Sequence, residues 1–295
     1  MTFSQFKDAL SKTIEDVTRH RTLQMAAALS YYFVLSVFPA LILLSAALGF
    51  LPSLGLLGQI LALAARFLPP DSVRLLNHLL TDIFTANRGA FLSIGMLGTL
   101  WAASGGFAAS IEALDVSYDV TDTRSLWKTR ALSVLLALII GLILLLGMPI
   151  MLMGPRFGEY LARHVYVPTP FVLLWPFLHW LLAIGFAILA VETLYSVAPN
   201  VKQRFLATLP GAVLTVTCWI GLTYLLGFYI RHFGMFNKMY GALGGAIALL
   251  IWFYWTSFVM LVGAELNSEL AKASRKGRLV ERETDPERSD VDKAA

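Results

Sequence analysis

The carboxylates at the ends of long apolar segments are the side chains of this sequence that could do chemistry. Glu192 and Glu265 each follow an apolar run, and neither has a basic residue within one helical turn. Because a charge left in hydrocarbon is costly, an ionisable residue in such a segment is a functional candidate. We expect the two side chains to point into a shared interior polar site, where burial favours the protonated form and would allow proton-coupled gating. The alternative is that both merely reach interfacial water.

A second set of carboxylates follows the second apolar run. Glu112, Asp115 and Asp119 are spaced i, i+3 and i+7, so a helix would carry them on one face. Paired carboxylates can carry protons or hold a divalent cation. Salt bridging is the favoured interpretation, because adjacent segments are rich in cations, namely Arg124, Lys128, Arg130, Lys202 and Arg204. Asn237 and Tyr240, which precede the last apolar run, complete the candidate polar and transport site.

The elements that must position these side chains are membrane helices. Hydrophobic residues make up 57% of the chain and charged residues 14%, whereas soluble domains hold about 25% charged residues. Runs of about 20 apolar residues cross the roughly 30 Å hydrocarbon core of a bilayer. Six such runs cover residues 25–50, 90–111, 131–153, 171–191, 206–230 and 242–262. We therefore expect an all-α polytopic integral membrane protein with six transmembrane helices in one domain, residues 25–270.

Three further segments flank or connect the spans. Residues 1–24 alternate apolar and charged side chains at helical spacing, which predicts a cytoplasmic amphipathic segment at the membrane interface. Residues 52–88 are too polar to cross and are broken by Pro69 and Pro70, so we expect an extracytoplasmic helical hairpin between spans 1 and 2. Residues 271–295 form a charged cytoplasmic tail, which we expect to be disordered.

The distribution of basic residues predicts the orientation. Of the 23 Lys and Arg residues, sixteen fall on the side of both termini and seven on the other side of a six-span topology. The positive-inside rule then places the N- and C-termini in the cytoplasm. This orientation accounts for the net charge of +4 without a nucleic acid partner.

Small residues and one proline predict how the spans pack. The last span carries a stripe of small residues at spacings of three and four: Gly241, Gly244, Gly245 and Ala248. Such a stripe allows a neighbouring helix backbone to approach closely. Pro39, inside the first span, predicts a kink because it lacks a backbone N–H.

No cofactor or metal site is predicted. Cys218 is the single cysteine, so neither a disulfide nor a cysteine cluster for zinc can form within one chain. The five histidines are scattered, and no GxxxxGK[ST] loop is present, so the protein would not hydrolyse nucleotide itself. The expected partners are membrane lipids, a second copy of the chain and proteins that the sequence does not identify, with no nucleic acid among them.

Four stretches of the sequence resemble the YihY/BrkB family of bacterial inner-membrane proteins. They read SYYFVLSVFPALILL, WAASGGFAASIEALDVSYDV, YSVAPNVKQRFLATLPGAVL and FNKMYGALGGAIALLIWFYWTSFVMLVGAELNSE. The resemblance implies a six-helix integral protein of the bacterial cytoplasmic membrane, linked to serum resistance and to envelope or lipid transport. An older label of the family is ribonuclease BN, and the sequence argues against it because it has no His-x-His-x-Asp-His run.

The leading functional hypothesis is therefore a transporter or lipid translocase of the inner membrane that acts in cell-envelope homeostasis. The alternative is a non-transporting membrane scaffold of an envelope complex. A ribonuclease ranks third, because the sequence offers no metal or catalytic cluster for it, and we do not expect an enzyme.

Overall fold

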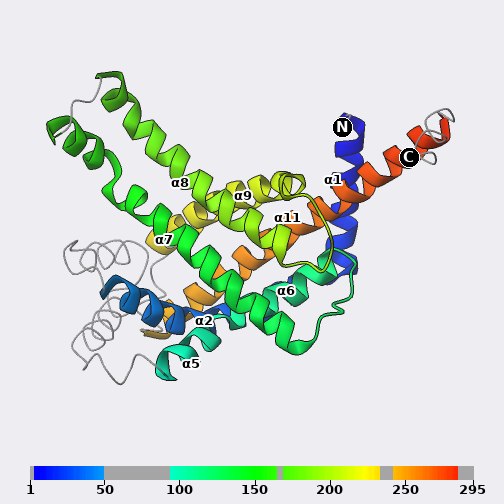
Figure 1. Cartoon of the computed structure of the whole chain (residues 1–295), viewed down its shortest axis with the longest axis horizontal. Coiled ribbons are helices and arrows are strands. Elements are labelled where there is room, and N and C mark those ends of the chain that lie inside the picture. Colours follow the sequence, from blue (N-terminus) through cyan, green and yellow to red (C-terminus); the bar gives the residue numbers. More distant parts are fainter. Residues whose placement is uncertain (1–2, 50–93, 165–168, 233–241, 285–295) are drawn as a thin grey trace, which may run out of the picture.

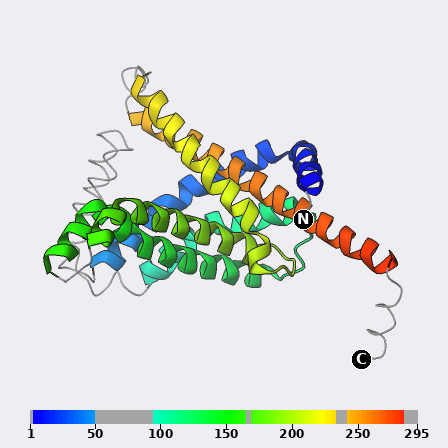
Figure 2. The same cartoon turned by 90° about the horizontal axis from the view of Figure 1, so that it is seen from above.

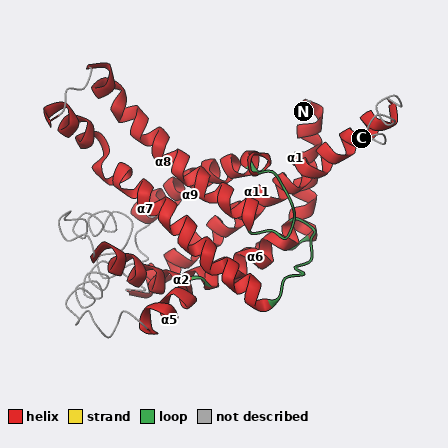
Figure 3. Ribbon diagram, in the orientation of Figure 1, coloured by secondary structure: helices red, strands yellow, loops and turns green. Residues whose placement is uncertain are grey.

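The structure is a computed structural model that describes residues 3–49, 94–164, 169–232 and 242–284. Every regular element in these residues is a helix (Figure 3), which confirms the expected all-α class. The elements are α1 (Phe3–Arg19), α2 (Thr22–Gly49), α5 (Ile94–Ala103), α6 (Gly105–Ser117), α7 (Leu126–His164), α8 (Thr169–Val197), the 3₁₀ helix η1 (Phe205–Ala207), α9 (Leu209–His232) and α11 (Ala242–Thr284).

Five of the described helices are long and apolar enough to cross a membrane. Their candidate spans are Thr22–Leu41 in α2, Leu126–Gly147 in α7, Leu174–Val197 in α8, Leu209–Tyr229 in α9 and Gly244–Ser274 in α11. They correspond to five of the six expected spans. The remaining one, 90–111, falls on α5 and α6, and its first residues, 90–93, lie outside the described part.

A break at Ser104 separates α5 from α6, and a side chain from α2 causes it. In an unbroken helix the backbone N–H of Gly106 would donate to the carbonyl of Ala102. Instead it donates to the Ser36 hydroxyl at 2.8 Å, and that hydroxyl donates to the Ala102 carbonyl at 3.4 Å. A Cβ at Gly106 would lie 2.7 Å from the ring of Phe33, so only glycine lets α2 come this close. Insertion of a side chain into the hydrogen-bond ladder is a known cause of helix breaks.

The long helix α11 lies at the centre of the bundle. It packs against α2, α9, α1 and α6, while α7 and α8 run side by side as a pair (Figure 1). Seen from above, α9 and α11 cross obliquely over the layer of α7 and α8 (Figure 2). The largest fully buried apolar side chains come from five helices and are Leu29, Ile111, Leu114, Leu136, Tyr195 and Leu261.

Helix α1 packs on α11 with its small and polar side chains rather than with its apolar ones. Ala9, Thr13 and Asp16 are buried, whereas Leu10 and Ile14 remain 43% and 68% exposed. These two apolar side chains therefore do not pack on α11, and the interfacial position expected for residues 1–24 stays a prediction.

Several expectations about the chain ends and turns differ from the structure or fall outside it. Helix α11 continues to Thr284, past residue 271, where the charged tail was expected to begin, and the disorder of the tail stays a prediction. Residues 285–295 and the expected hairpin at 52–88 lie outside the described residues. Pro39 lies inside α2 and does not end it, and its kink stays a prediction.

The small-residue stripe of the last span is described only in part. Gly244 is buried, Gly245 and Ala248 are half-buried, and Gly241 lies outside the described residues. The stripe therefore stays a packing prediction.

A close helix contact lies further along α11, where Gly263 faces Gly211 of α9. A Cβ at Gly263 would lie 2.8 Å from the Gly211 carbonyl and 2.7 Å from the Tyr195 hydroxyl of α8. Both distances are shorter than real Cβ contacts, so the two glycines set how closely α9 and α11 approach. This contact brings α8, α9 and α11 together beside the candidate site.

Candidate functional site

The end of α1, the end of α6 and the later part of α11 lie together at one end of the bundle (Figure 1), and charged side chains at these ends form ion pairs. We call this group the charged cluster, and its members are Asp16, Arg19, His20, Asp119 and Lys272. Glu265, which contacts His20 of this cluster, is 0% exposed, and Glu192 of α8 is 1% exposed. Polar groups that are buried this deeply must find hydrogen-bond partners or hold a proton.

The corner between α1 and α2 positions His20. Helix α1 ends at Arg19, and α2 begins at Thr22. The backbone N–H of His20 still donates to the Asp16 carbonyl at 2.8 Å, and Arg21 then turns the chain with a left-handed φ of 51°. As a result the His20 ring enters the space between α6 and α11, where its side chain is 9% exposed.

The end of α6 positions Asp119 in a similar way. The N–H groups of Val120 and Asp119 donate to the carbonyls of Asp115 and Val116 at 2.9 and 3.0 Å, which is a Schellman ending. Its left-handed position, usually glycine, is filled by Asp119 with φ 53°. Aspartate tolerates this conformation better than most residues. Its carboxylate joins the charged cluster.

His20 joins a buried carboxylate to an exposed one. Its Nδ1 lies 2.7 Å from Glu265 Oε1, and its Nε2 lies 3.0 Å from Asp119 Oδ1. A neutral imidazole carries only one N–H, so it cannot donate to both carboxylates. Both contacts are satisfied when the ring is doubly protonated, or when Glu265 carries a proton and donates to Nδ1.

Asp119 has two further cationic partners besides His20. Arg19 Nη2 lies 3.1 and 3.0 Å from its two oxygens, and Lys272 Nζ lies 2.6 Å from Oδ2 and 2.7 Å from Glu269 Oε1. Burial acts to raise the pKa of Asp119, but its cationic partners outweigh burial and lower the pKa. For Asp16 burial prevails over the same cations and raises the pKa.

Glu192 of α8 is held at the start of α9. Thr208 Oγ1 lies 2.6 Å from Glu192 Oε1 and 2.9 Å from the Phe205 carbonyl. One hydroxyl hydrogen can serve only one of these acceptors. When Glu192 carries a proton, it donates to Thr208 while Thr208 donates to Phe205, and both contacts are hydrogen bonds.

Asn267 connects α11 to the same turn. Its Oδ1 accepts from the backbone N–H of Gly211, and its Nδ2 donates to the Thr208 carbonyl, both at 2.8 Å. The first N–H groups of a helix have no partner within the helix. Asn267 therefore caps α9 from a different helix and fixes α9 beside Glu192.

Tyr118 links the two buried carboxylates electrostatically. It is 7% exposed, its hydroxyl neighbours the amides of Gln203 and Asn267, and the charges of both Glu192 and Glu265 act on it. Burial raises the pKa of Tyr118 above its ordinary value, so its phenol keeps its proton. A protonated phenol can both donate and accept a hydrogen bond.

Each buried carboxylate has one oxygen that forms no hydrogen bond with any of the described residues. These atoms are Glu192 Oε2 and Glu265 Oε2. Such an atom binds water or carries a proton. Each carboxylate has its own direct partner, Thr208 for Glu192 and His20 for Glu265, and the shared polar site stays a prediction.

The predicted face of three carboxylates on α6 is divided by the structure. Glu112 is exposed, Asp115 is 3% exposed and Asp119 lies beyond the end of the helix. Asp119 does form salt bridges, with Arg19 and Lys272 rather than with the cations expected from the sequence. Helix α6 ends after Ser117, so the spacing i+7 no longer describes one helical face.

Asp115 serves to join two loops. Its Oδ1 accepts from the backbone N–H of Asn200 at 2.6 Å, and burial raises its pKa although this bond opposes the shift. Arg124 donates to the carbonyls of Ala198 and Pro199 at 2.9 and 3.0 Å. The Ala-Pro-Asn turn after α8 is thereby fastened to the loop after α6.

Sequence reasoning missed several residues of this site, namely His20, Tyr118, Thr208 and Asn267. The only available signal was position, because His20 follows the amphipathic helix and Asn267 follows Glu265 by two residues. Asn237 and Tyr240 lie outside the described residues, so their place in the site stays a prediction. Within the described part of the chain, no group of three or more His, Cys, Asp or Glu side chains is placed to hold a metal ion.

The helices and their apolar surfaces define a multi-pass helical membrane protein. The chain belongs to the family described as Virulence factor BrkB, whose family model matches residues 13–289. The resemblance found in the sequence is thereby confirmed.

Three relatives illustrate the range of this similarity. A Bacillus subtilis protein, YfkH, named as ribonuclease-like, is 28% identical over 90% of this chain and 96% of its own length. A UPF0761 membrane protein of Tolumonas auensis is 29% identical over 84% of this chain and 80% of its own. One from Xanthomonas campestris is 25% identical over 85% of this chain but only 58% of its own length. No solved structure matches this chain.

Proposed function

We propose that this protein is a transporter or lipid translocase of the bacterial cytoplasmic membrane, and that Glu192 and Glu265 carry the protons that couple it. The proposal rests on one observation. Two carboxylates from different membrane helices are 1% and 0% exposed, and one oxygen of each has no partner of normal hydrogen-bond length among the described residues. Carboxylates kept inside a membrane bundle at such a cost mark proton or ion pathways in pumps and transporters.

The hydrogen-bond pattern supports proton binding at both carboxylates. At Glu192 an extra proton completes the contacts of Thr208, and at Glu265 it completes one of the two contacts of His20. Each site therefore has a protonated and an unprotonated arrangement that differ by one hydrogen. Two such arrangements are what a proton-coupled gate requires.

The order of the groups suggests a path for protons. Asp119 is 38% exposed, His20 is 9% exposed and Glu265 is fully buried. Tyr118, which is buried beside this path, responds to the charges of both carboxylates. Glu112 and Asp115 lie off this path, since Glu112 is exposed and Asp115 holds the turn at Asn200.

A membrane scaffold of an envelope complex is the alternative function. It would use the exposed apolar faces and the charged cluster for assembly, with no need for unpartnered carboxylates. The ribonuclease activity suggested by the name of one relative ranks third, because no described residue group favours it. The basic residues at the end that carries the charged cluster favour a cytoplasmic location for that end.

Reconstitution into proteoliposomes tests the proposal. Movement of a fluorescent phospholipid between leaflets and acidification of a trapped dye measure lipid and proton flux. Wild type should accelerate at least one of them, and Glu192→Gln and Glu265→Gln, which keep the side-chain shape, should lower it to the rate of protein-free liposomes. Glu15→Gln, an exposed carboxylate on α1, is the matched control and should behave as wild type. Wild-type protein without either flux would favour the scaffold instead.

A further inference from the structure

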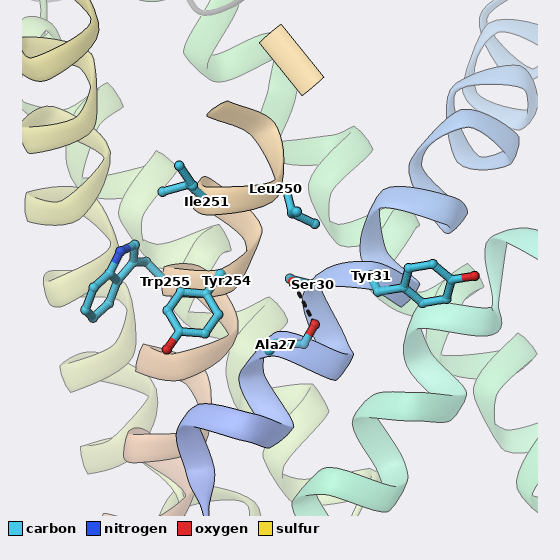
Figure 4. A pocket seen from close by; sticks show the side chains of 7 residues that line it. All are labelled: Ala27, Ser30, Tyr31, Leu250, Ile251, Tyr254 and Trp255. Carbon is cyan, nitrogen blue, oxygen red and sulfur yellow. Dashed lines mark hydrogen bonds between the residues drawn. The ribbon is translucent and has the colours of Figure 1, made fainter. Parts of the chain in front are cut away.

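An apolar groove lies between α2 and α11 (Figure 4). Its volume is about 560 Å³, within the roughly 300–1,000 Å³ range of small-molecule sites. Ala27, Ser30 and Tyr31 form one wall, and residues of α11 between Leu250 and Trp255 form the other. The groove shares no lining residue with the charged cluster or with the buried carboxylates.

Both walls of the groove belong to candidate membrane spans, so its mouth faces hydrocarbon. Tyr31 is 57% exposed, and Leu250 and Trp255 are 42% and 40% exposed. The Ser30 hydroxyl donates to the Ala27 carbonyl at 2.7 Å, so it is already satisfied within its own helix. The groove therefore offers aliphatic and aromatic surface and calls for an apolar occupant.

The position of the groove fits a segment of one acyl chain. At 1.5 Å per residue, its lining covers about 6 Å of α2, from Ala27 to Tyr31, and about 8 Å of α11, from Leu250 to Trp255. Ala27 lies about 8 Å along α2 from its start at Thr22. The groove therefore begins near the end of the bundle that carries the charged cluster.

Cations at that end suit an anionic headgroup. Arg21 is exposed at the corner where α2 begins, six residues before Ala27. Arg19 and Lys272 also keep 54% and 44% of their side chains exposed, although both are paired with carboxylates of the charged cluster. Basic residues at the membrane surface attract anionic lipids.

We propose that the groove between α2 and α11 is a binding site for an anionic phospholipid, with one acyl chain lying between Ala27 and Leu250 and the headgroup at the charged end. The site holds lipid whether or not the protein transports it. Its test measures binding alone, so it does not depend on the proposed coupling by Glu192 and Glu265.

Photo-crosslinking in proteoliposomes tests this proposal directly. The probe is a phosphatidylglycerol with a diazirine in one acyl chain, and the labelled peptides of the full chain are mapped by mass spectrometry. Label should concentrate on residues 27–31 and 250–255. Excess unlabelled phosphatidylglycerol should displace it, whereas Glu192→Gln and Glu265→Gln should be labelled as wild type.

Variants that fill the groove provide the decisive comparison. Ala27→Phe places a ring in the groove from α2 and should lower its label by roughly tenfold, and Leu250→Trp does the same from α11 in case the first variant does not fold. Gly185→Phe is the matched control, since it fills a smaller hollow on α8 of about 170 Å³ and should leave the label unchanged.

Two outcomes would overturn the proposal. Label spread evenly over lipid-facing residues of α8 and α9, insensitive to Ala27→Phe, would show ordinary boundary lipid only. Crosslinks between two copies of the chain through residues 250–255 would show that the groove is a contact of a homo-oligomer.

Discussion

Asp119 combines a strained backbone conformation with several ionic contacts. Its φ of 53° belongs to the left-handed region, which glycine enters more readily. Strain of this kind persists where the surroundings stabilise it and often marks functional sites. Here the surroundings are Arg19, His20 and Lys272, which together attach α1 and α11 to the end of α6.

The lowered pKa of Asp119 predicts how stability depends on pH. Because the folded-state pKa lies below the ordinary aspartate value of 3.8, the contribution of the charged carboxylate is present above that value and is lost as pH falls through the folded pKa. Asp119→Asn keeps a residue that tolerates left-handed φ but removes the charge. It should lower stability at pH 7 by about 1 kcal/mol or less, and its difference from wild type should shrink as the pH falls below 3.8 towards the folded pKa.

Thermal unfolding in detergent between pH 7 and pH 3 measures this effect. Asp8→Asn, an exposed aspartate on α1, is the control and should follow wild type at each pH. A difference between Asp119→Asn and wild type that stays constant down to pH 3 would show that the carboxylate does not act through its charge.

At the scale of helices, packing in the bundle depends on Gly263 of α11. Its α-carbon faces the Gly211 carbonyl and the hydroxyls of Tyr195 and Thr215. Gly263→Ala should destabilise the protein by about 1–3 kcal/mol, because the added methyl overlaps backbone that cannot move freely. Gly141→Ala on α7 meets nothing within 4 Å and should be neutral or stabilising, as alanine favours helices.

Thermal melting of both glycine variants in the same detergent makes the comparison. Equal melting temperatures for Gly263→Ala and Gly141→Ala would mean that α9 and α11 can separate at no cost, against the packing described here.

Helix existence was predictable from the sequence, whereas helix interruptions were not. Spans follow from composition, because roughly 30 Å of hydrocarbon requires about 20 apolar residues and internal backbone hydrogen bonds. The break at Ser104 depends on Ser36, which is far away in the sequence and reaches Gly106 only after α2 has packed.

The candidate site was predictable only where burial follows from position in a span. Glu192 and Glu265 stood out as carboxylates at the ends of apolar runs, and both are buried. His20 was not predictable, because its role arises from the corner between α1 and α2 that brings it to Glu265, 245 residues along the chain. The prediction that Asp119 shares one helical face with Glu112 and Asp115 failed for a related reason. It required α6 to continue beyond Ser117, where the helix ends.

At the scale of the whole molecule, contacts between distant segments place many helix ends on one side. The start of α2 meets the later part of α11 through His20 and Glu265. The end of α6 meets α11 through Asp119 and Lys272, and the loop before α7 meets the end of α8 through Arg124. If the first span starts on the same side of the membrane as the last span ends, the chain crosses the membrane an even number of times.

An even number of crossings leads to the last prediction, because the described residues hold five candidate spans. We expect α5 and α6 to supply the sixth crossing together, since α6 ends on the side where α2 starts.

Cysteine labelling in intact cells with a membrane-impermeant maleimide tests this on a Cys218→Ser background. Lys128→Cys and Lys202→Cys, exposed at the charged end, should be protected as cytoplasmic sites. Arg74→Cys, Arg163→Cys and Lys238→Cys should be labelled from outside. If Arg74→Cys is labelled but Lys238→Cys is protected, the number of crossings between them is odd, α5 and α6 do not complete a span, and the contact of α1 with α11 would need another explanation.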